Sequence, residues 1–356
     1  EESALKVFKE EGAEVNLKNR RVKIPEGLVK DSIKKTPSEV KLYYRNSKKI
    51  VTIGGANTNF LPGSSALNIL DLETGKARKP TVKDQSDFAK LVDALPNINV
   101  QNGPMIVTDI PVEICDRYRV YPILKNSIKP IITGAYSIDG LKDMIKMTKI
   151  VMDEEAIKKP IFSNMCCPTS PLALGTLVCQ AVMECAKEKV PTVVISAPIS
   201  GATSPATLAG TLVQHACEVL SAIVLGQVVR SGSSFIYGGS PGILDMRYGN
   251  FSMGATESNL MNCAHVEIGK YFGLPTHAYL GLSDSKIADA QAGIEATSGI
   301  TLAVLTEVNA VSGPGMLEFE SCQSFEKLVT DNQICEMAFR LKRGVQVSAE
   351  TLALDL

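Results

Sequence analysis

Residues 192–210 read TVVISAPISGATSPATLAG, and the fold of the whole chain follows from this stretch. Its first part, 192–197, is a short apolar run rich in β-branched residues, which suits a strand buried on both faces. Pro198 ends that run, and a turn of small and hydroxyl-bearing residues follows. From Ala206 the apolar residues take helical spacing. A strand, a small-residue turn and a helix make one half of a βαβ unit.

The same unit repeats along the chain. Eight strand-like segments are each followed by a helical pattern, and they span 58–61, 99–102, 130–133, 160–164, 192–197, 234–237, 276–280 and 309–312. This alternation predicts an α/β fold, a (β/α)8 barrel, whose turns after the strands meet at one face, the usual place of an active site. A doubly wound open sheet is the alternative, less favoured because no glycine fingerprint follows an early strand.

The sequence divides into three parts. Residues 1–56 contain a short helix and alternating strands, which predicts a small N-terminal α+β cap. The barrel is expected over 57–343, and 344–356 is expected to start a C-terminal segment that is truncated. Lys and Arg are frequent in the cap, where either a solvated face or a docking surface for an acidic partner explains them.

Composition excludes several classes of function. The 356 residues carry a net charge of −1, so no basic field indicates nucleic acid or an anionic membrane surface as a partner. We find no apolar run of the ~18 residues that a membrane span needs and no signal peptide, and therefore expect a cytoplasmic protein. The nine Cys residues are scattered in a pattern that does not suit zinc, so no metal is expected.

The turns after the predicted strands are rich in Gly, Ser, Thr and Pro and poor in charge. They contain no HExxH motif, Walker loop or GxSxG elbow. His215 and His265 are predicted to lie within helices, whereas His277 lies in the seventh strand and could face the barrel interior. Without an obvious acid–base set, proton-transfer chemistry is not favoured and the catalytic residues stay unknown.

Aromatic rings near the strand ends predict a pocket for a methylated ammonium ion, because such rings attract cations by about 0.5–2 kcal/mol per contact. Core packing is the alternative role for each ring. The predicted substrate-binding rings are Phe60, Tyr136, Phe162, Tyr237, Phe251 and Tyr279.

Charged residues are few among these turns. Arg247 could hold a substrate carboxylate bidentately, or it could pair with Asp245 as a brace within its loop. Asp284, Glu318 and Glu320 are the carboxylates expected on the same face, and each could compensate a cation, cap a helix or lie in water. Of these carboxylates, we assign Asp284 and Glu318 to the predicted substrate site.

Several stretches, taken in order, resemble the trimethylamine methyltransferase family, in the non-pyrrolysine branch that includes glycine betaine methyltransferases. The resemblance covers nearly the whole chain. It rests on FLPGSS at 60–65 with NILDLETG at 68–75, DALPNI at 93–98, PTSP at 168–171, GATSPATLAG at 201–210, YGG at 237–239 with DMR at 245–247, SDSK at 283–286 with DAQ at 289–291, and FEKLV at 325–329 with Asp331.

This resemblance implies a (β/α)8 barrel that transfers a methyl group from a methylated amine to the Co(I) centre of a separate corrinoid protein. It places the chain in one-carbon metabolism such as methanogenesis. No pyrrolysine is present, which favours a quaternary amine such as glycine betaine over trimethylamine. The chain also lacks a DxHxxG corrinoid motif, so the cobamide is expected on the partner, which would dock at the barrel mouth. A homo-oligomer is left open.

Two other classes of function stay open at this point. A barrel that has lost activity and only binds or senses a methylated amine would show the same sequence pattern. A barrel lyase or aldolase would need a Schiff-base lysine or a metal inside the barrel, and Lys286 is the only lysine near the turns.

Overall fold

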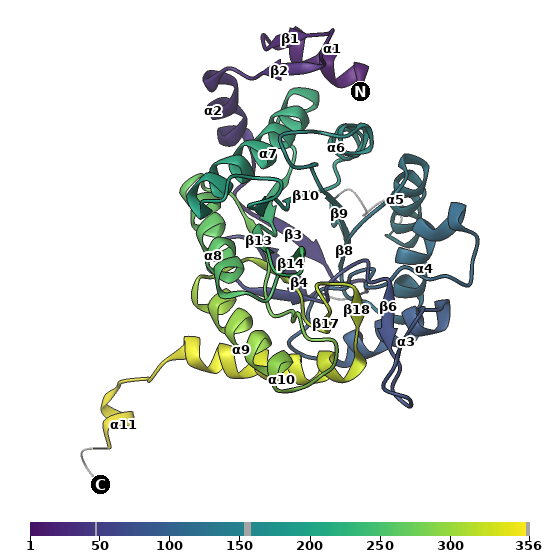
Figure 1. The fold of residues 1–356 in the computed structure, drawn as a ribbon, viewed down its shortest axis with the longest axis vertical. Helices are drawn as coiled ribbons and strands as arrows, with labels where there is room; N and C mark the ends of the chain where they lie inside the picture. The colour runs from purple at the N-terminus through teal and green to yellow at the C-terminus, as the bar shows by residue number, and fades with distance from the viewer. Residues whose placement is uncertain (47, 153–157, 354–356) are drawn as a thin grey trace.

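A computed structural model describes residues 1–46, 48–152 and 158–353 of the chain. Seven parallel strands form one sheet in the order β5–β16–β15–β12–β10–β9–β8, and this sheet occupies the centre of the molecule (Figure 1). Their bounds are β5 (Asn59–Leu61), β8 (Ile131–Gly134), β9 (Phe162–Cys166), β10 (Thr192–Ser196), β12 (Phe235–Gly239), β15 (Thr276–Tyr279) and β16 (Ala310–Ser312).

The segment predicted as the second strand, 99–102, closes the ring without forming a regular strand. Isolated parallel bridges join Phe60 to Ile98 and Gln101 to Ile131, so this segment lies between β5 and β8. The side chain of Asn99 accepts a hydrogen bond from the backbone N–H of Phe60 at 3.0 Å and thus takes a place that a backbone carbonyl would take in a ladder. The predicted (β/α)8 barrel is confirmed, with one strand reduced to bridges.

Side chains of the strands alternate between the barrel interior and the helix layer. In β10, Val193 and Ile195 pack in the same core as Ile132 and Ile236, whereas Val194 packs with residues of the surrounding helices. All five residues of β10 are buried, as the apolar run at 192–197 predicts for a strand covered on both faces.

Eight helices follow the strand-like segments in order and surround the barrel (Figure 1). Several begin at side-chain caps: Thr81 accepts from Asp84 N–H, Thr207 from Gly210 N–H, and Asp289 from Ala292 N–H. Ser324 caps α10 in the same way. The helices are α3 (Val82–Ala94), α4 (Cys115–Asn126), α5 (Ile138–Met152), α6 (Thr176–Glu188), α7 (Leu208–Val229), α8 (Thr256–Tyr271), α9 (Ala290–Leu305) and α10 (Phe325–Arg343).

One helix, α7, is long and apolar enough to cross a membrane by length and composition alone, although no such run was expected. It packs against α6, α8 and β10. Val219, Ala222 and Ile223 are fully buried there, and so is the carboxylate-bearing Glu218. These contacts make α7 a core helix of the barrel.

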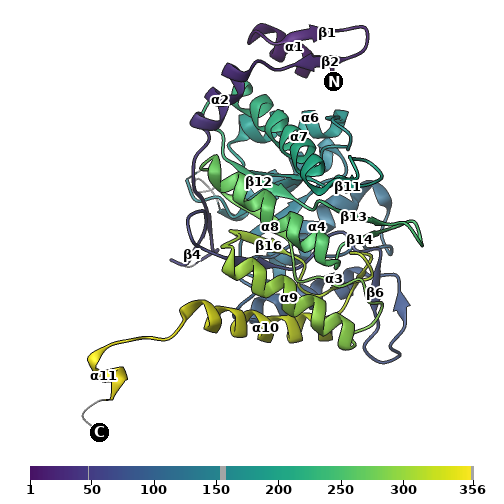
Figure 2. The ribbon, with the colours of Figure 1, turned by 60° about the vertical axis from the view of Figure 1, so that its left-hand side comes forward.

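The first 56 residues form two pieces rather than one cap. α1 (Glu2–Glu10), β1 (Glu14–Asn16), β2 (Arg21–Lys23) and α2 (Glu26–Lys35) lie beyond α6 and α7, at the top of Figures 1 and 2. β3 (Val40–Tyr43) and β4 (Ile50–Ile53) form an antiparallel hairpin whose apolar residues join the barrel core. At the opposite terminus, α11 (Ala349–Leu352) projects away from the barrel, and residues 354–356 lie outside the described part.

Short strands and one short helix lie after the barrel strands, on the face where those strands end. Two small sheets form there, with the orders β17–β18–β6–β7 and β11–β13–β14. Their bounds, with the short helix η1, are β6 (Asn68–Leu70), β7 (Ala77–Arg78), η1 (Val112–Ile114), β11 (Ile199–Ser200), β13 (Gly242–Asp245), β14 (Asn250–Ser252), β17 (Met316–Leu317) and β18 (Cys322–Gln323). The hairpin between β13 and β14 projects from the body of the barrel (Figure 2).

A buried ion pair ties α10 to this face. Lys327 Nζ lies 2.7 Å from Asp331 Oδ2 and donates to the carbonyl of Gly281 at 3.0 Å. The same carboxylate oxygen accepts from the backbone N–H of Gly315 at 2.7 Å. Both charged side chains are almost completely buried, so neither charge can turn to water if its partner is lost.

We expect Lys327→Met to lower the free energy of unfolding by about 3–5 kcal/mol, because it leaves the Asp331 carboxylate buried without its counter-charge. Adding Asp331→Leu should recover part of this loss. Lys83→Met is the matched control, since Lys83 and Asp87 have the same helical spacing but Lys83 is 85% exposed. Urea denaturation measures all three variants, and equal losses for Lys327→Met and Lys83→Met would contradict the prediction.

Candidate active site

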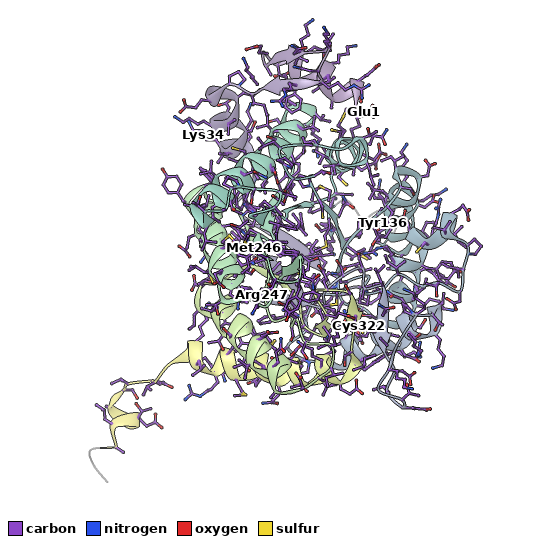
Figure 3. The ribbon with its side chains drawn as sticks, in the orientation of Figure 1. Glu1, Lys34, Tyr136, Met246, Arg247 and Cys322 are labelled. Carbon is purple, nitrogen blue, oxygen red and sulfur yellow. The ribbon has the colours of Figure 1, made fainter. Side chains whose placement is uncertain are left out.

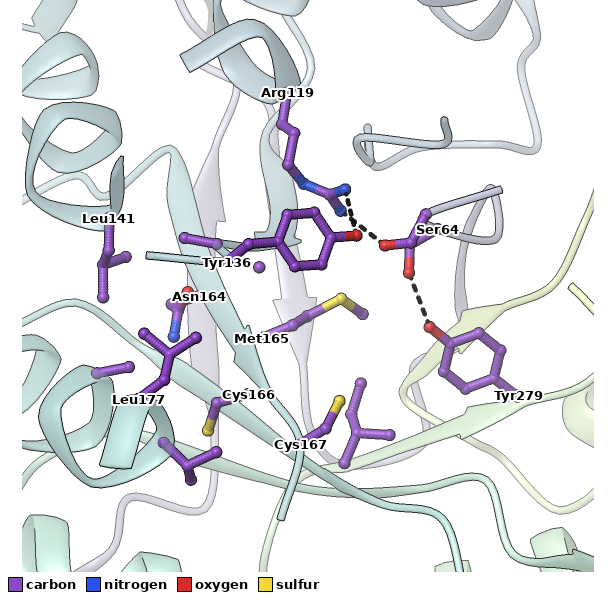
Figure 4. A pocket seen from close by; sticks show the side chains of 16 residues that line it. Ser64, Arg119, Tyr136, Leu141, Asn164, Met165, Cys166, Cys167, Leu177 and Tyr279 are labelled. Atoms are coloured by element: carbon purple, nitrogen blue, oxygen red, sulfur yellow. Dashed lines mark hydrogen bonds between the residues drawn. The ribbon is translucent and has the colours of Figure 1, made fainter. Parts of the chain in front are cut away.

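A cavity of about 230 Å³ lies at the carboxyl ends of the strands (Figure 4). It is smaller than the 300–1,000 Å³ typical of sites for drug-sized ligands, so it suits a small metabolite. We call the part nearest the barrel interior the mouth, lined by Ser64, Ser65, Met165, Cys167, Ile195 and Tyr279. We call the part over β9 the arm, lined by Leu141 of α5, Asn164 and Cys166 of β9, and Leu177, Val178 and Ala181 of α6. Arg119 and Tyr136 lie between the two parts in Figure 4.

Arg119 of α4 is a buried cation in the cavity wall, only 2% exposed. Its guanidinium donates to the hydroxyls of Tyr136 at 3.0 Å, Ser65 at 3.1 Å and Thr133 at 2.9 Å, and it lies 5.0 Å from the centre of the Tyr136 ring. Its Nε has no partner. Within the described ranges no carboxylate forms an ion pair with it. Buried charges are normally paired, so this guanidinium is set up for an anionic group.

Glu320 lies near the mouth, in an unusual stretch of backbone. Glu318, Phe319 and Glu320 have φ values of 50°, 54° and 70°, three consecutive non-glycine residues in the left-handed region. Each such residue costs about 1–3 kcal/mol and persists where the surroundings enforce it, often at functional sites. The Glu320 carboxylate accepts from the backbone N–H of Ser64 at 3.3 Å.

The surroundings of the Glu320 carboxyl group act on its pKa in opposing directions. Burial raises its pKa to about 7, against the opposing effect of hydrogen bonds from Ser64 and Tyr279 and of the nearby Arg119 charge. The carboxyl group therefore titrates near neutral pH. The cavity wall thus contains a permanent cation, and a carboxyl group lies next to the mouth, in contact with Ser64.

Neutral polar groups complete the mouth. The hydroxyls of Ser64 and Tyr279 are 3.0 Å apart, and burial raises the pKa of Tyr279 well above its usual value, which keeps the phenol neutral. Two residues earlier on β15, His277 packs edge-on to Tyr279 and lies 2.8 Å from the Ser312 hydroxyl. Burial lowers the pKa of His277 to about 3. The sequence left open whether His277 faces the barrel interior. In the structure it does, and its imidazole ring is neutral.

The loop between β9 and α6, which begins at Cys167, is held by a carboxylate of α7. Glu218 is 2% exposed and accepts from the Ser170 hydroxyl at 2.8 Å and the Leu172 N–H at 2.9 Å. It also accepts from the hydroxyl of Ser196, at the end of β10. The PTSP stretch at 168–171 therefore has a structural role beside the cavity.

Two of the nine predicted binding residues, Tyr136 and Tyr279, line the cavity. Tyr279 faces the barrel interior from the end of β15. Tyr136 follows β8, is 51% exposed and covers Arg119. Both come from the predicted strand-end positions.

Three other predicted rings face the helix layer instead of the cavity. Phe60 packs edge-on against Phe339 of α10 at 5.7 Å. Phe162 lies in a core cluster with residues of α4, α5 and α6. Tyr237 packs against Phe272 at 6.4 Å, and its hydroxyl lies 3.3 Å from Nδ1 of His215. The physical reason is the alternation of strand side chains, which sends these positions outward.

Arg247 lies on the projecting hairpin between β13 and β14, and Figure 3 shows it over a different part of the barrel from Tyr136. Its side chain is 80% exposed, and its Nη2 lies 2.9 Å from Oδ2 of Asp245. The structure thus gives Arg247 the bracing role that the sequence analysis left as the alternative. A residue of this exposure does not belong to the cavity wall.

The remaining predicted residues stabilise the loops around the mouth. Asp284 accepts from the Ser252 hydroxyl at 2.6 Å and from the backbone N–H of Met253, and burial raises its pKa. Phe251 packs against the barrel core. Glu318 forms an ion pair with Lys286 at 3.8 Å. None of the three lines the cavity.

Two residues that line the cavity, Arg119 and Asn164, were absent from the predicted site, and so was Glu320, which contacts Ser64 beside the mouth. Arg119 shares a buried helix face with Cys115 and Pro122, so helical spacing could have shown a charge among apolar positions. Asn164 interrupts a buried strand, where Asn is rare. In the sequence, Glu320 was only one of the three carboxylates expected on this face. Among the residues that the structure describes, no group of three or more His, Cys, Asp or Glu side chains could hold a metal.

A barrel with a small, charged cavity at its strand ends defines a barrel enzyme that acts on a small molecule. The family model described as trimethylamine methyltransferase (MTTB) matches residues 1–356. The chain belongs to this family of methyltransferases.

Its curated relatives carry two kinds of name. The trimethylamine methyltransferase MttB of Desulfitobacterium hafniense (strain DSM 10664 / DCB-2) is 34% identical over 357 residues, covering 100% of this chain and 72% of that protein. MttB of Methanosarcina barkeri is 36% identical over 99% of this chain and 72% of its own length. The glycine betaine methyltransferase of Desulfitobacterium hafniense (strain Y51) is 33% identical over 100% of this chain and 74% of its own length.

A solved structure shares the fold. The crystal structure of the hydroxylamine complex of MtmB matches with a TM-score of 0.65 over 97% of this chain and 73% of that one. The two are 13% identical in sequence, so this likeness bears on the fold alone.

We expect Glu320→Gln to raise the melting temperature at pH 8 more than at pH 5. The folded-state pKa of about 7 exceeds the ordinary value of 4.5, so the folded protein holds this proton more tightly than the unfolded chain. The resulting stability is fully present below pH 4.5 and is lost as pH rises through 7. Calorimetry at both pH values measures the difference, with Glu318→Gln as the neighbouring control. Equal shifts at the two pH values would contradict a raised pKa.

Proposed function

We propose that this chain removes a methyl group from a zwitterionic quaternary amine of the glycine betaine type and transfers it to the Co(I) of a separate corrinoid protein. The observation that carries the proposal is a pair of charged groups around one small cavity. Arg119 lies in the cavity wall without a carboxylate partner among the described residues, and Glu320 lies next to the mouth, where it accepts from the Ser64 N–H. A betaine carries a carboxylate and a methylated ammonium ion a few bonds apart, which matches this pair.

The carboxylate of such a substrate suits Arg119. The guanidinium is held in place by the hydroxyls of Ser65, Thr133 and Tyr136, and its Nε still lacks an acceptor. A carboxylate bound there would supply the missing counter-charge. Hydrogen bonds between charged groups of this kind are about twice as strong as neutral ones, and the planar fork of Arg fixes their direction.

The methylated ammonium group suits the mouth. Glu320 in its ionised form would balance the positive charge, and the bound cation would in turn favour that form. The Tyr279 ring adds a cation–π surface, and Met165 and Ile195 offer apolar contacts to the methyl groups. A fixed guanidinium in the same cavity would repel a cation that has no carboxylate. This favours a betaine over a simple methylamine.

The proposed reaction requires little proton transfer by the protein. One N–CH3 bond breaks, its electron pair stays on nitrogen, and the quaternary ammonium leaves as a neutral tertiary amine that needs no general acid. The cobalt of the partner supplies the nucleophile that takes the methyl group. The chain itself orients the N–CH3 bond through the charges at both ends of the substrate and keeps water away with the apolar wall of the mouth.

We expect Arg119→Met to weaken glycine betaine binding by about 10- to 100-fold, the range for losing hydrogen bonds to a charged group. Tetramethylammonium, which has no carboxylate, should bind the variant at least as tightly as the wild type, because a repelling charge is gone. Titration calorimetry measures both ligands, and Arg247→Met is the control with an exposed guanidinium. A uniform loss for both ligands would assign Arg119 to structure alone.

The methyl acceptor is tested separately. Purified chain with glycine betaine alone should form no dimethylglycine, and adding a reduced corrinoid protein should start a reaction that saturates with its concentration. The change of the visible spectrum from Co(I) to methylated cobalt follows it directly. Sustained demethylation without cobalt would overturn the proposal, and binding without transfer to any corrinoid protein would indicate an inactive sensor barrel.

A further inference from the structure

The arm of the cavity has no role in binding glycine betaine, whose two charged groups are placed at the mouth and at Arg119. We propose that the arm receives a side chain of the substrate, that Asn164 recognises a hydrogen-bonding group on it, and that the substrate class is therefore the N-methylated α-amino acids with polar side chains. This inference rests on the proposed function.

Asn164 is the observation that carries it. The residue is 1% exposed and lines the cavity. Among the residues that the structure describes, neither its amide nitrogen nor its amide oxygen has a hydrogen-bond partner. Leaving a buried donor and acceptor unpaired is unfavourable, and such groups in native proteins call for an explanation. A ligand that offers both an acceptor and a donor would satisfy both atoms at once.

The walls of the arm explain why a polar side chain would be recognised strongly there. Leu141 of α5 and Leu177 of α6 lie on the same side of the cavity as Asn164 (Figure 4). Ala181 of α6 also lines the cavity, so this part of the wall is mainly apolar. A trapped water needs two to four polar partners, and these side chains add none to the two atoms of the amide, which is the lower limit. In such surroundings the amide discriminates strongly between a ligand group that pairs with it and one that does not.

The order of the subsites matches an α-amino acid. Its α-carbon bears three groups: the methylated nitrogen, the carboxylate and the side chain. With the nitrogen at Glu320 and the carboxylate at Arg119, the third substituent is left for the arm, on the other side of Arg119 and Tyr136 in Figure 4. A carboxamide side chain would pair with the Asn164 amide through two hydrogen bonds.

The test uses two ligands of nearly the same shape, the N,N,N-trimethyl derivatives of asparagine and leucine, with glycine betaine as the reference. Calorimetry should show that the wild type binds the asparagine derivative at least tenfold more tightly than the leucine derivative. In Asn164→Leu this preference should reverse, while the dissociation constant for glycine betaine stays within about threefold. The variant should also melt no lower than the wild type, because it replaces an unpaired polar group by an apolar one of similar size.

The outcomes separate the two proposals. If all three ligands bind and require Arg119, but the asparagine-to-leucine ratio is close to one or the same in both proteins, the arm holds only water and this inference fails. Binding of glycine betaine with rejection of both derivatives also overturns it, since the arm would then be closed to side chains. If no ligand binds, or if Arg119→Met changes none of the affinities, the proposed function itself fails.

Discussion

Arg119 is a positive charge buried in a barrel wall, and no carboxylate among the described residues forms an ion pair with it. The arrangement of the site depends on this constraint. A buried guanidinium must have acceptors, and here the hydroxyls of Ser65, Thr133 and Tyr136 provide them from three different segments. These bonds connect α4 with β8 itself and with the turns after β5 and β8. They fix the guanidinium without cancelling its charge, which is left for a ligand.

Glu320 is a second ionisable group in an unfavourable position, in this case a carboxyl group. Burial raises its pKa to about 7, and its backbone, with that of Glu318 and Phe319, lies in the left-handed region. Both features are unfavourable for folding, and proteins tolerate such features where function requires them. A group that is neutral or charged with similar free energy can respond to the charge of a ligand.

The barrel itself supplies the rigidity that these charged groups require. Strands such as β10 fill the interior with β-branched side chains, and a carboxylate of α7, Glu218, holds the loop that begins beside the cavity. The ion pair of Lys327 and Asp331 ties α10 to the turns at Gly281 and Gly315. Each of these contacts places a turn relative to a strand end, so that the site is built from short segments on a fixed scaffold.

The sequence by itself determined the barrel, because the alternation of apolar strands and amphipathic helices is a local pattern that repeats eight times. It also predicted that Tyr136 and Tyr279 lie at strand ends beside a pocket. Only the tertiary structure decided which face each strand residue occupies. Phe60, Phe162 and Tyr237 point to the helices. The sequence could not show this, because a strand that is buried on both faces has no polar side to distinguish its two faces. The same holds for the charges. Arg119 and Asn164 line one cavity and Glu320 contacts Ser64 at its edge, although the three lie far apart in sequence. Their proximity depends on the closure of the barrel. For Arg247 the sequence left two roles open. Only the folded chain shows that its side chain is exposed on a hairpin and paired with Asp245, because exposure is a property of the folded chain.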